Sequence, residues 1–356
     1  MSSTENTAEN TTRSGSQSTS QSGAPQREEA GGVETLPLAR ALNLAMDDAM
    51  SADEKVLMMG EDIGTLGGVF RVTQGLKQTY GAHRVMDTPL GEAGIIGTAI
   101  GLAMRGYRPV CEIQFDGFVF PSFNQITSQL AKIHARSSGR IDLPVVIRIP
   151  YGGNIGSIEH HSESPEALFA HTAGLRVMSP SNPQDAYTML RSAISSQDPV
   201  VFLEPKRRYW LKGEVDRSLA ETDTQLAQIV REGTDLTLAA YGPLVPVALA
   251  AAQAAAEDGR SIEVIDLRSI SPLDVDTVEE SVSRTGRLVV THEAPTFGGM
   301  GGELAAEIGT RCYWHLEAPV IRVGGFHMPY PVAGVEEDYL PNIDRLLEAF
   351  DRSFSY

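Results

Sequence analysis

Short apolar runs alternate with segments of helical periodicity along most of the chain. Apolar side chains recur at helical spacing over 38–49, and a continuous apolar run follows at 56–59. Continuous apolar strands between helices are typical of a parallel sheet covered on both faces. The pattern predicts strands at 56–59, 109–115, 144–149, 199–203, 236–241, 262–267 and 288–291, and helices at 38–49, 93–104, 184–195, 245–257 and 274–282.

Changes in composition divide the chain into two α/β domains. Residues 1–33 are rich in Ser and Thr and contain no aromatic residue. Because such a segment has little apolar surface to bury, we expect a disordered tail. A polar, irregular stretch interrupts the later alternation, and we interpret 211–230 as a linker. The expected domains are therefore 34–210 and 231–356, each a mostly parallel sheet with helices on both faces.

Composition narrows the classes of function. The formal net charge of −17 argues against nucleic acid as a partner, because binding phosphates needs clustered positive charge. Two cysteines, Cys111 and Cys312, form no disulfide framework, and the first residues lack the apolar run of a secretory signal, so we expect a cytoplasmic protein. The uncharged stretch 236–256 contains Pro243 and Pro246, and we interpret it as strand, turn and helix rather than a membrane span.

Two features of the sequence suggest a bound ligand, and each has a plain structural alternative. The glycine-rich segment 297–302 precedes a helical pattern, but it lacks the spacing of a dinucleotide- or phosphate-binding loop. A tight connection between a strand and a helix explains it. Glu92 is a carboxylate in an apolar setting, yet the helix dipole alone favours an acid in the first turn of a helix.

A third feature is the polar cluster at 159–166. Ser164 as a helix N-cap followed by Pro165 would account for most of it. That interpretation leaves His160 and His161 unexplained. Adjacent histidines are a poor arrangement for two ligands on one metal, and no other metal-binding spacing is present, so we expect no metal site on this chain.

Eight short motifs occur in order along the chain: Gly60-Glu-Asp-Ile-Gly64, 67–76, Asp87-Thr-Pro-Leu-Gly-Glu-Ala-Gly-Ile95, Glu112-Ile-Gln-Phe115, His161-Ser-Glu-Ser-Pro-Glu166, 198–206, 263–268 and 285–293. Together they resemble the beta subunit of the thiamine-diphosphate-dependent 2-oxo acid dehydrogenases, the decarboxylating first component of the pyruvate and branched-chain complexes. The likeness covers everything except the tail. It implies a transketolase-like pyrimidine-binding domain over 34–210 and a transketolase C-terminal-like domain over 231–356.

The resemblance implies a cofactor, thiamine diphosphate, and the residues around it. Glu92 matches the acid that shares a proton with the aminopyrimidine ring, a bond that a buried carboxyl makes short and strong. His161 matches the histidine at the substrate end, where a neutral imidazole passes a proton either way near pH 7. The other implied residues are Glu61, Leu90, Gly91, Gln114 and Phe118 at the cofactor, and Phe115, Asp116 and Phe118 at the substrate.

The chain also departs from the family pattern. Glu163 stands where the family usually has Gln, and an inward-facing carboxylate there would raise the pKa of His161. The Gly-Asp-Gly motif through which related enzymes hold Mg²⁺ and the cofactor's diphosphate is absent. The resemblance therefore implies that a separate alpha subunit holds both, in an α2β2 assembly. Some members also hold a structural K⁺ through backbone carbonyls near Val145 and 193–198, which side chains do not reveal.

The implied activity is oxidative decarboxylation of a branched-chain 2-oxo acid, with acyl transfer to lipoyl-lysine of an acyltransferase core. The branched-chain preference depends on the texture of the motifs at 112–115, 161–166 and 204–209, and a pyruvate or acetoin dehydrogenase stays open. So do a self-sufficient thiamine enzyme, such as a transketolase or a deoxyxylulose-phosphate synthase, and a non-catalytic assembly subunit. Residues 231–356 contain nine arginines against twenty carboxylates, which suits docking of the core's small basic subunit-binding domain.

Overall fold

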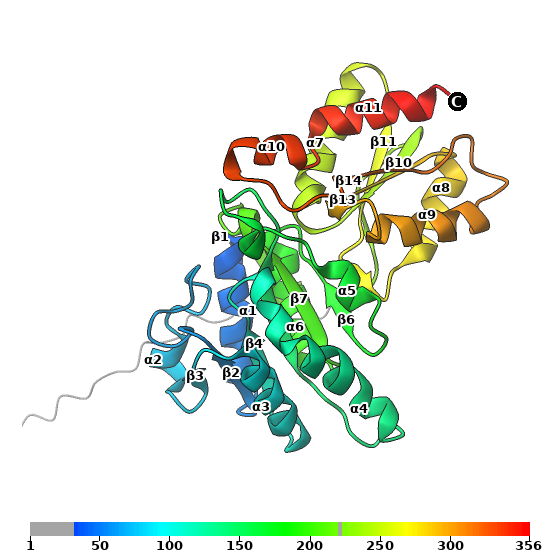
Figure 1. Cartoon of the computed structure of the whole chain (residues 1–356). Helices are drawn as coiled ribbons and strands as arrows, with labels where there is room; N and C mark the ends of the chain where they lie inside the picture. Colours follow the sequence, from blue (N-terminus) through cyan, green and yellow to red (C-terminus); the bar gives the residue numbers. More distant parts are fainter. Residues whose placement is uncertain (1–31, 220–222) are drawn as a thin grey trace, which may run out of the picture.

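The computed structural model describes residues 32–219 and 223–356, and two sheets form its framework (Figure 1). The first sheet contains, in spatial order, β12 (Ser269–Ser271), β6 (Arg176–Met178), β7 (Val200–Pro205), β5 (Val146–Tyr151), β4 (Arg108–Glu112), β2 (Val56–Gly60) and β3 (Val85–Asp87). The second contains β14 (Ile321–Gly325), β13 (Leu288–Pro295), β10 (Leu236–Ala240), β11 (Ile262–Asp266) and β9 (Gln228–Arg231). A separate antiparallel pair joins β1 (Val33–Pro37) to β8 (Lys212–Asp216).

Within each sheet the pairs are parallel, except for the antiparallel edge strands β12 and β9. The α-helices are α1 (Leu38–Ala52), α2 (Leu76–Tyr80), α3 (Glu92–Met104), α4 (Ala131–Arg136), α5 (Glu166–Ala170), α6 (Pro183–Ser195), α7 (Val245–Glu257), α8 (Val275–Thr285), α9 (Met300–Arg311), α10 (Glu336–Tyr339) and α11 (Ile343–Phe354). Short 3₁₀ or π turns are η1 (Asp116–Ser122), η2 (Gln125–Leu130), η3 (Glu159–His161), η4 (Lys206–Arg208), η5 (Arg217–Leu219), η6 (Gly242–Leu244) and η7 (Ala333–Val335).

The two faces of the first sheet are buried under different helices. In β2, Val56 and Met58 belong to the apolar cluster that contains α1 and α6. Leu57 and Met59 belong to the cluster on the other face, with α3. Successive strand residues point to opposite faces, so covering both faces requires the continuous apolar runs seen in the sequence. The expected class, two α/β units with mostly parallel sheets, is confirmed.

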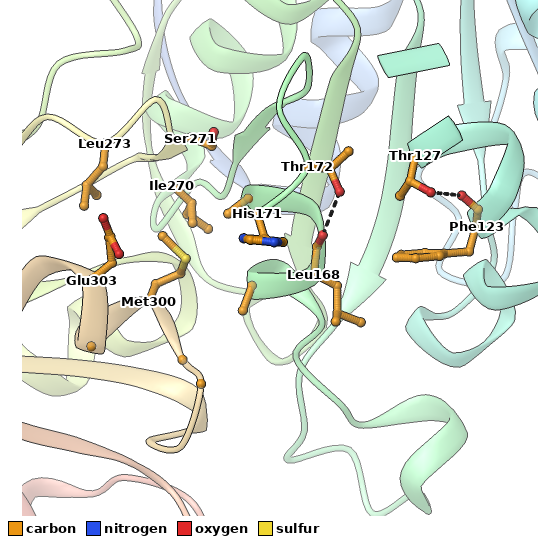
Figure 2. Close-up of a pocket in the computed structure, with 15 residues that line it drawn as sticks. Phe123, Thr127, Leu168, His171, Thr172, Ile270, Ser271, Leu273, Met300 and Glu303 are labelled. Atoms are coloured by element: carbon orange, nitrogen blue, oxygen red, sulfur yellow. Dashed lines mark hydrogen bonds between the residues drawn. The ribbon is translucent and has the colours of Figure 1, made fainter. Parts of the chain in front are cut away.

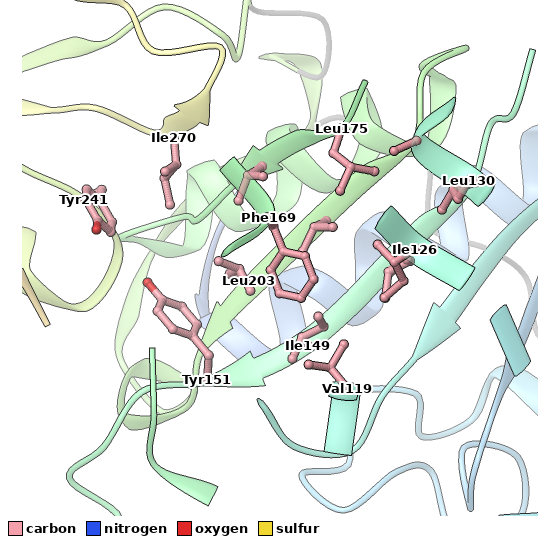
Figure 3. Close-up of a cluster of buried hydrophobic side chains, with 14 of the residues drawn as sticks. Val119, Ile126, Leu130, Ile149, Tyr151, Phe169, Leu175, Leu203, Tyr241 and Ile270 are labelled. Carbon is pink, nitrogen blue, oxygen red and sulfur yellow. The ribbon is translucent and has the colours of Figure 1, made fainter. Parts of the chain in front are cut away.

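One apolar cluster continues from the first domain into the second. Tyr151, Phe169 and Leu203 of the first domain lie in the same cluster as Tyr241 and Ile270 (Figure 3). The edge strand β12 also comes from the second half of the chain and pairs with β6. The two domains therefore pack through a shared core, and contacts from the second domain can reach the loops of the first.

Local signals in the sequence predicted several elements well. The helix expected at 245–257 is α7, and the uncharged stretch 236–256 forms β10, η6 and α7, as predicted. Helix α6 begins where Asn182 accepts a hydrogen bond from the backbone N–H of Asp185 at 2.9 Å, with Pro183 at the first helical position. No helix within the described ranges is long and apolar enough to cross a membrane.

The expected irregular linker at 211–230 is wrong in its interior. It contains β8 and most of β9, which pair with β1 and β11. Both are edge strands with mostly exposed or half-buried side chains, so they lack the apolar run by which buried strands are recognised. The predicted disordered tail lies almost wholly outside the described residues, and Val33 at its end begins β1.

Candidate active site

The carboxyl ends of β2 and β4 bring Glu61 and Gln114 together. The two strands are parallel neighbours, so the residues that follow them meet at the same edge of the sheet. The side-chain amide of Gln114 lies 3.4 Å from the Glu61 carbonyl oxygen, to which it donates. The Glu61 carboxylate is buried and accepts a hydrogen bond from the backbone N–H of Gly91 at 3.1 Å. Burial raises the pKa of Glu61, the nearby Glu92 carboxylate adds to the rise, and the Gly91 N–H opposes it.

Glu92 begins α3 beside this pair and is 9 % exposed. The helix N-terminus stabilises a negative charge there. The neighbouring Leu90 is 85 % exposed, a high value for a leucine beside a buried acid. The four residues expected around the pyrimidine half of a cofactor, Glu61, Gly91, Glu92 and Gln114, therefore meet at one edge.

His161 lies between two phenylalanine rings. Its ring centroid is 4.2 Å from that of Phe115 and 5.2 Å from that of Phe118, both in edge-to-face geometry. Its Nδ1 is buried and has no hydrogen-bond partner among the described residues. Burial lowers the pKa of His161, the positive charge of Lys206 adds to this, and Glu159 opposes it. The imidazole is therefore neutral at pH 7 and has a ring nitrogen available to a ligand.

A buried ion pair holds the backbone on either side of this imidazole. Lys206 Nζ lies 2.5 Å from Asp116 Oδ1 and 2.6 Å from the carbonyl oxygen of His161, and it donates to both. The other Asp116 oxygen accepts from the Glu163 N–H at 2.9 Å. Burial raises the pKa of Asp116 to about 6, although Lys206 opposes the rise. Both Asp116 oxygens have partners, so the acid expected to bind substrate directly is better suited to holding the His161 loop.

Sequence reasoning gave Lys206 no role, although it lies within a quoted motif. The available signal was a lysine directly after Pro205 at the end of an apolar strand. Lys206 is 2 % exposed, and a buried lysine requires a charged partner. Its partner Asp116 is 90 residues earlier in the chain, so spacing alone did not indicate the pair.

Glu163 and Ser164 differ from what the sequence suggested. Glu163 is absent from the groups that shift the pKa of His161, which is lowered rather than raised. Its side chain lines a separate cavity of about 200 Å³ together with Tyr330 and Tyr339. Ser164 is not an N-cap: α5 begins at Glu166 with Pro165 before it, and Ser164 Oγ has no hydrogen-bond partner among the described residues.

A buried charge network lies on three neighbouring strands of the same sheet. Arg148 on β5 is 0 % exposed and donates to Glu112 on β4 at 2.7 Å and to both oxygens of Glu204 on β7 at 2.7 and 3.0 Å. The Tyr209 hydroxyl also donates to Glu204, at 2.6 Å. These bonds cross-link the strands whose ends carry Gln114 and Lys206, so they hold the site's supports in register.

A cleft of about 880 Å³ lies elsewhere, between the domains (Figure 2). The glycine-rich turn lines it beside Met300 and connects β13 to α9, which agrees with its interpretation as a tight connection. Two hydroxyls in the cleft, of Thr127 and Thr172, already donate to backbone carbonyls of their own segments. None of the expected site residues lines it. Among the described residues no group of three or more His, Cys, Asp or Glu side chains could hold a metal ion.

Comparison with known proteins agrees with this geometry. Residues 34–210 match the family model "Transketolase, pyrimidine binding domain", and residues 225–346 match "Transketolase, C-terminal domain". A solved structure entitled "Split gene transketolase, inactive beta4 tetramer" superposes with a TM-score of 0.74 at 19% identity, over 90% of this chain and 98% of that chain. The fold is therefore that of the transketolase-like proteins.

Curated relatives narrow the family further. The chain is 59% identical over 324 residues to "Pyruvate dehydrogenase E1 component subunit beta" of Leifsonia xyli, covering 91% of this chain and 96% of the relative. It is 53% identical to "3-methyl-2-oxobutanoate dehydrogenase subunit beta" of Mycobacterium tuberculosis, covering 90% and 92%. A "2-oxoisovalerate dehydrogenase subunit beta" of Pseudomonas aeruginosa is 43% identical, covering 92% and 97%. The chain belongs to the beta subunits of the pyruvate and branched-chain 2-oxo acid dehydrogenases, as the motifs predicted.

Proposed function

We propose that this chain is a beta subunit that completes a thiamine diphosphate site and serves oxidative decarboxylation of a 2-oxo acid, with acyl transfer to lipoyl-lysine. The observation that carries the proposal is the meeting of Glu61, Glu92 and Gln114 at one sheet edge, next to Phe115 and His161. Acids, an amide and aromatic rings suit an aminopyrimidine and an adjoining substrate.

The residues present fit the pyrimidine half of thiamine diphosphate. When bound, the cofactor supplies the electron sink that decarboxylation needs. Glu92 would share a proton with the ring nitrogen of the aminopyrimidine, and the Phe118 ring would pack against that heterocycle. The Gly91 N–H holds Glu61 in place beside Glu92. His161, neutral at pH 7, would accept or return a proton at the substrate.

We propose that an alpha subunit covers this edge in an α2β2 assembly and holds Mg²⁺ and the diphosphate. Support comes from the face of α3 next to Glu92. A Cβ added at Gly94, Gly97 or Gly101 would meet no atom within 4 Å, and the apolar Leu90 is exposed beside them. Small residues let a partner's backbone approach closely, so the surface suits a subunit contact. A structural K⁺ remains part of the proposal without a side chain to assign to it.

The first test is Glu92→Gln in the assembled α/β complex. The amide keeps the size of the side chain but cannot share a proton with the pyrimidine, so we expect decarboxylation to fall about 10²- to 10⁴-fold. Gel filtration should show unchanged assembly. The exposed Glu54 supplies a matched control, because Glu54→Gln removes the same charge. Unchanged activity in Glu92→Gln would instead favour a non-catalytic assembly subunit.

The substrate is the finer question. We propose a branched-chain 2-oxo acid, because the apolar rings of Phe115 and Phe118 suit an aliphatic side chain. Pyruvate is the second candidate, since the relative at 59% identity is named for it. We expect kcat/KM for 3-methyl-2-oxobutanoate to exceed that for pyruvate by about 10-fold or more, the scale of one or two methylenes in an apolar pocket. The reverse order would contradict the branched-chain assignment.

A further inference from the structure

The segment 152–163, which carries His161 near its end, is a closed loop after β5. The backbone N–H of Gly152 donates to the carbonyl of Glu163 at 2.9 Å and ties the two ends together. Gly152, Asn154 and Gly156 have φ values of 82°, 63° and 72°, so the chain bends sharply three times within five residues. The N–H groups in these bends are outside any sheet ladder and need acceptors from elsewhere.

Two carboxylates of the second domain supply those acceptors. Glu293 on β13 accepts from the N–H of Gly153. Glu336, at the start of α10, accepts from the N–H of Asn154 at 2.5 Å with one oxygen and from that of Gly156 at 3.2 Å with the other. Glu336 is 4 % exposed. A buried carboxylate that receives charge-assisted hydrogen bonds on both oxygens fixes its donors in place.

Tyr330 completes the contact. Its hydroxyl donates to Glu336 at 2.6 Å and lies 3.3 Å from the Asn154 nitrogen. A Cβ added at Gly153 would lie 1.6 Å from that hydroxyl, so only glycine permits this approach. Glu336, Tyr330 and the loop therefore form one closely packed unit across the domain junction.

From these contacts we infer that Glu336 is a positioning residue for His161. It acts through the backbone: it holds the tip of the 152–163 loop from the second domain, and the far end of that loop presents the imidazole to Phe115 and Phe118. The second domain thereby sets the order of the substrate end of the site. The placement of the loop is independent of the reaction, whereas its kinetic consequence rests on the proposed function.

The test follows the exposure of the His161 ring rather than activity alone. Diethyl pyrocarbonate acylates neutral imidazoles, and mass spectrometry gives the labelling rate of His161 relative to His160, whose side chain is 57 % exposed. The full-length chain is labelled alone and after assembly with its alpha subunit. In Glu336→Gln an amide NH₂ faces backbone donors, and a buried N–H loses its acceptor. We expect the His161-to-His160 ratio to rise about 5-fold or more.

Two further variants keep the test decisive. Glu337→Gln removes the same charge at the exposed neighbouring position and should leave the ratio unchanged. Tyr330→Phe keeps the ring packing against Tyr339 but removes the hydroxyl, so the ratio should rise in the same direction. An unchanged ratio in folded Glu336→Gln overturns the inference. If that variant does not fold, Tyr330→Phe decides, and an unchanged ratio there overturns it.

The kinetic arm separates this inference from the proposed function. In an active α/β complex, Glu336→Gln should raise KM for the 2-oxo acid and lower kcat, while the affinity for thiamine diphosphate stays as in the wild type. A wild-type complex without decarboxylase activity would contradict the proposed function and leave the labelling result to decide the inference. Weakened cofactor binding with an unchanged labelling ratio would contradict the role of Glu336.

Discussion

The protonation state of His161 follows from its surroundings. Its ring lies between Phe115 and Phe118, where burial disfavours the charged form, and the ammonium of Lys206 adds repulsion. Both effects favour the neutral imidazole, and Glu159 opposes them only in part. A histidine with a lowered pKa stays a proton acceptor at more acidic pH than an exposed one.

At the residue scale, this sets a pH dependence. If neutral His161 accepts a proton during turnover, kcat/KM should fall as pH decreases through its pKa, so the acid limb should lie below the ordinary value of 6.5. His161→Asn should remove that limb and lower kcat/KM about 10²- to 10⁴-fold. His160→Asn is the matched control and should retain it. A limb above 6.5, or one that survives in His161→Asn, would refute this role.

At the scale of elements, the first sheet is held in register by charge as well as by apolar packing. Arg148, Glu112 and Glu204 lie on three adjacent strands and are all buried. Burying such groups is costly, and their mutual hydrogen bonds offset that cost only while every partner is present. Removing the arginine would leave two carboxylates buried at the centre of the sheet.

We therefore expect Arg148→Met to lower the free energy of unfolding by about 3–5 kcal/mol, the cost of uncompensated buried charge. Urea denaturation followed by circular dichroism measures it. Arg176→Met removes a comparable ion pair, with Asp198, whose side chains are 31 % and 48 % exposed. That control should change stability by about 1 kcal/mol or less. Equal effects of the two substitutions would mean that the buried network contributes no more than a surface pair.

At the scale of the whole molecule, negative charge is concentrated in the second domain. Residues 231–356 contain nine arginines and twenty carboxylates, and the last lysine of the chain is Lys212. Helices α8 and α9 lie side by side (Figure 1), and Arg311 bridges acids of both. Next to them Trp314 is 90 % exposed and Tyr313 is 65 % exposed, packed edge to face at 4.8 Å. An exposed aromatic pair beside acids suits a basic partner surface.

We expect the basic subunit-binding domain of an acyltransferase core to bind the assembled complex in a salt-dependent way. Because exposed charges are screened within about 10 Å at 0.1 M salt, its affinity should fall about 10-fold or more between 0.05 and 0.5 M salt. Isothermal titration calorimetry measures this, and Trp314→Ala should weaken binding at every salt concentration. Affinity that does not change with salt would argue against electrostatic docking.

The sequence by itself determined the alternation of helices and strands, the class of fold and the candidates Glu61, Glu92 and His161. These follow from local information: periodicity reports which faces are buried, and residues after parallel strands meet at one edge. Its motifs also indicated the family, and the relatives confirmed it.

Only the tertiary structure decided the supports of the site. Lys206 pairs with Asp116 across 90 residues of chain, and Glu336 reaches Asn154 across 182. The edge strands β8 and β9 likewise become strands through partners elsewhere in the chain. Contacts between distant residues leave no periodic trace in the sequence, since their geometry depends on how whole elements pack. The candidate acids and the histidine were therefore visible in the sequence, and the residues that hold them in place were not.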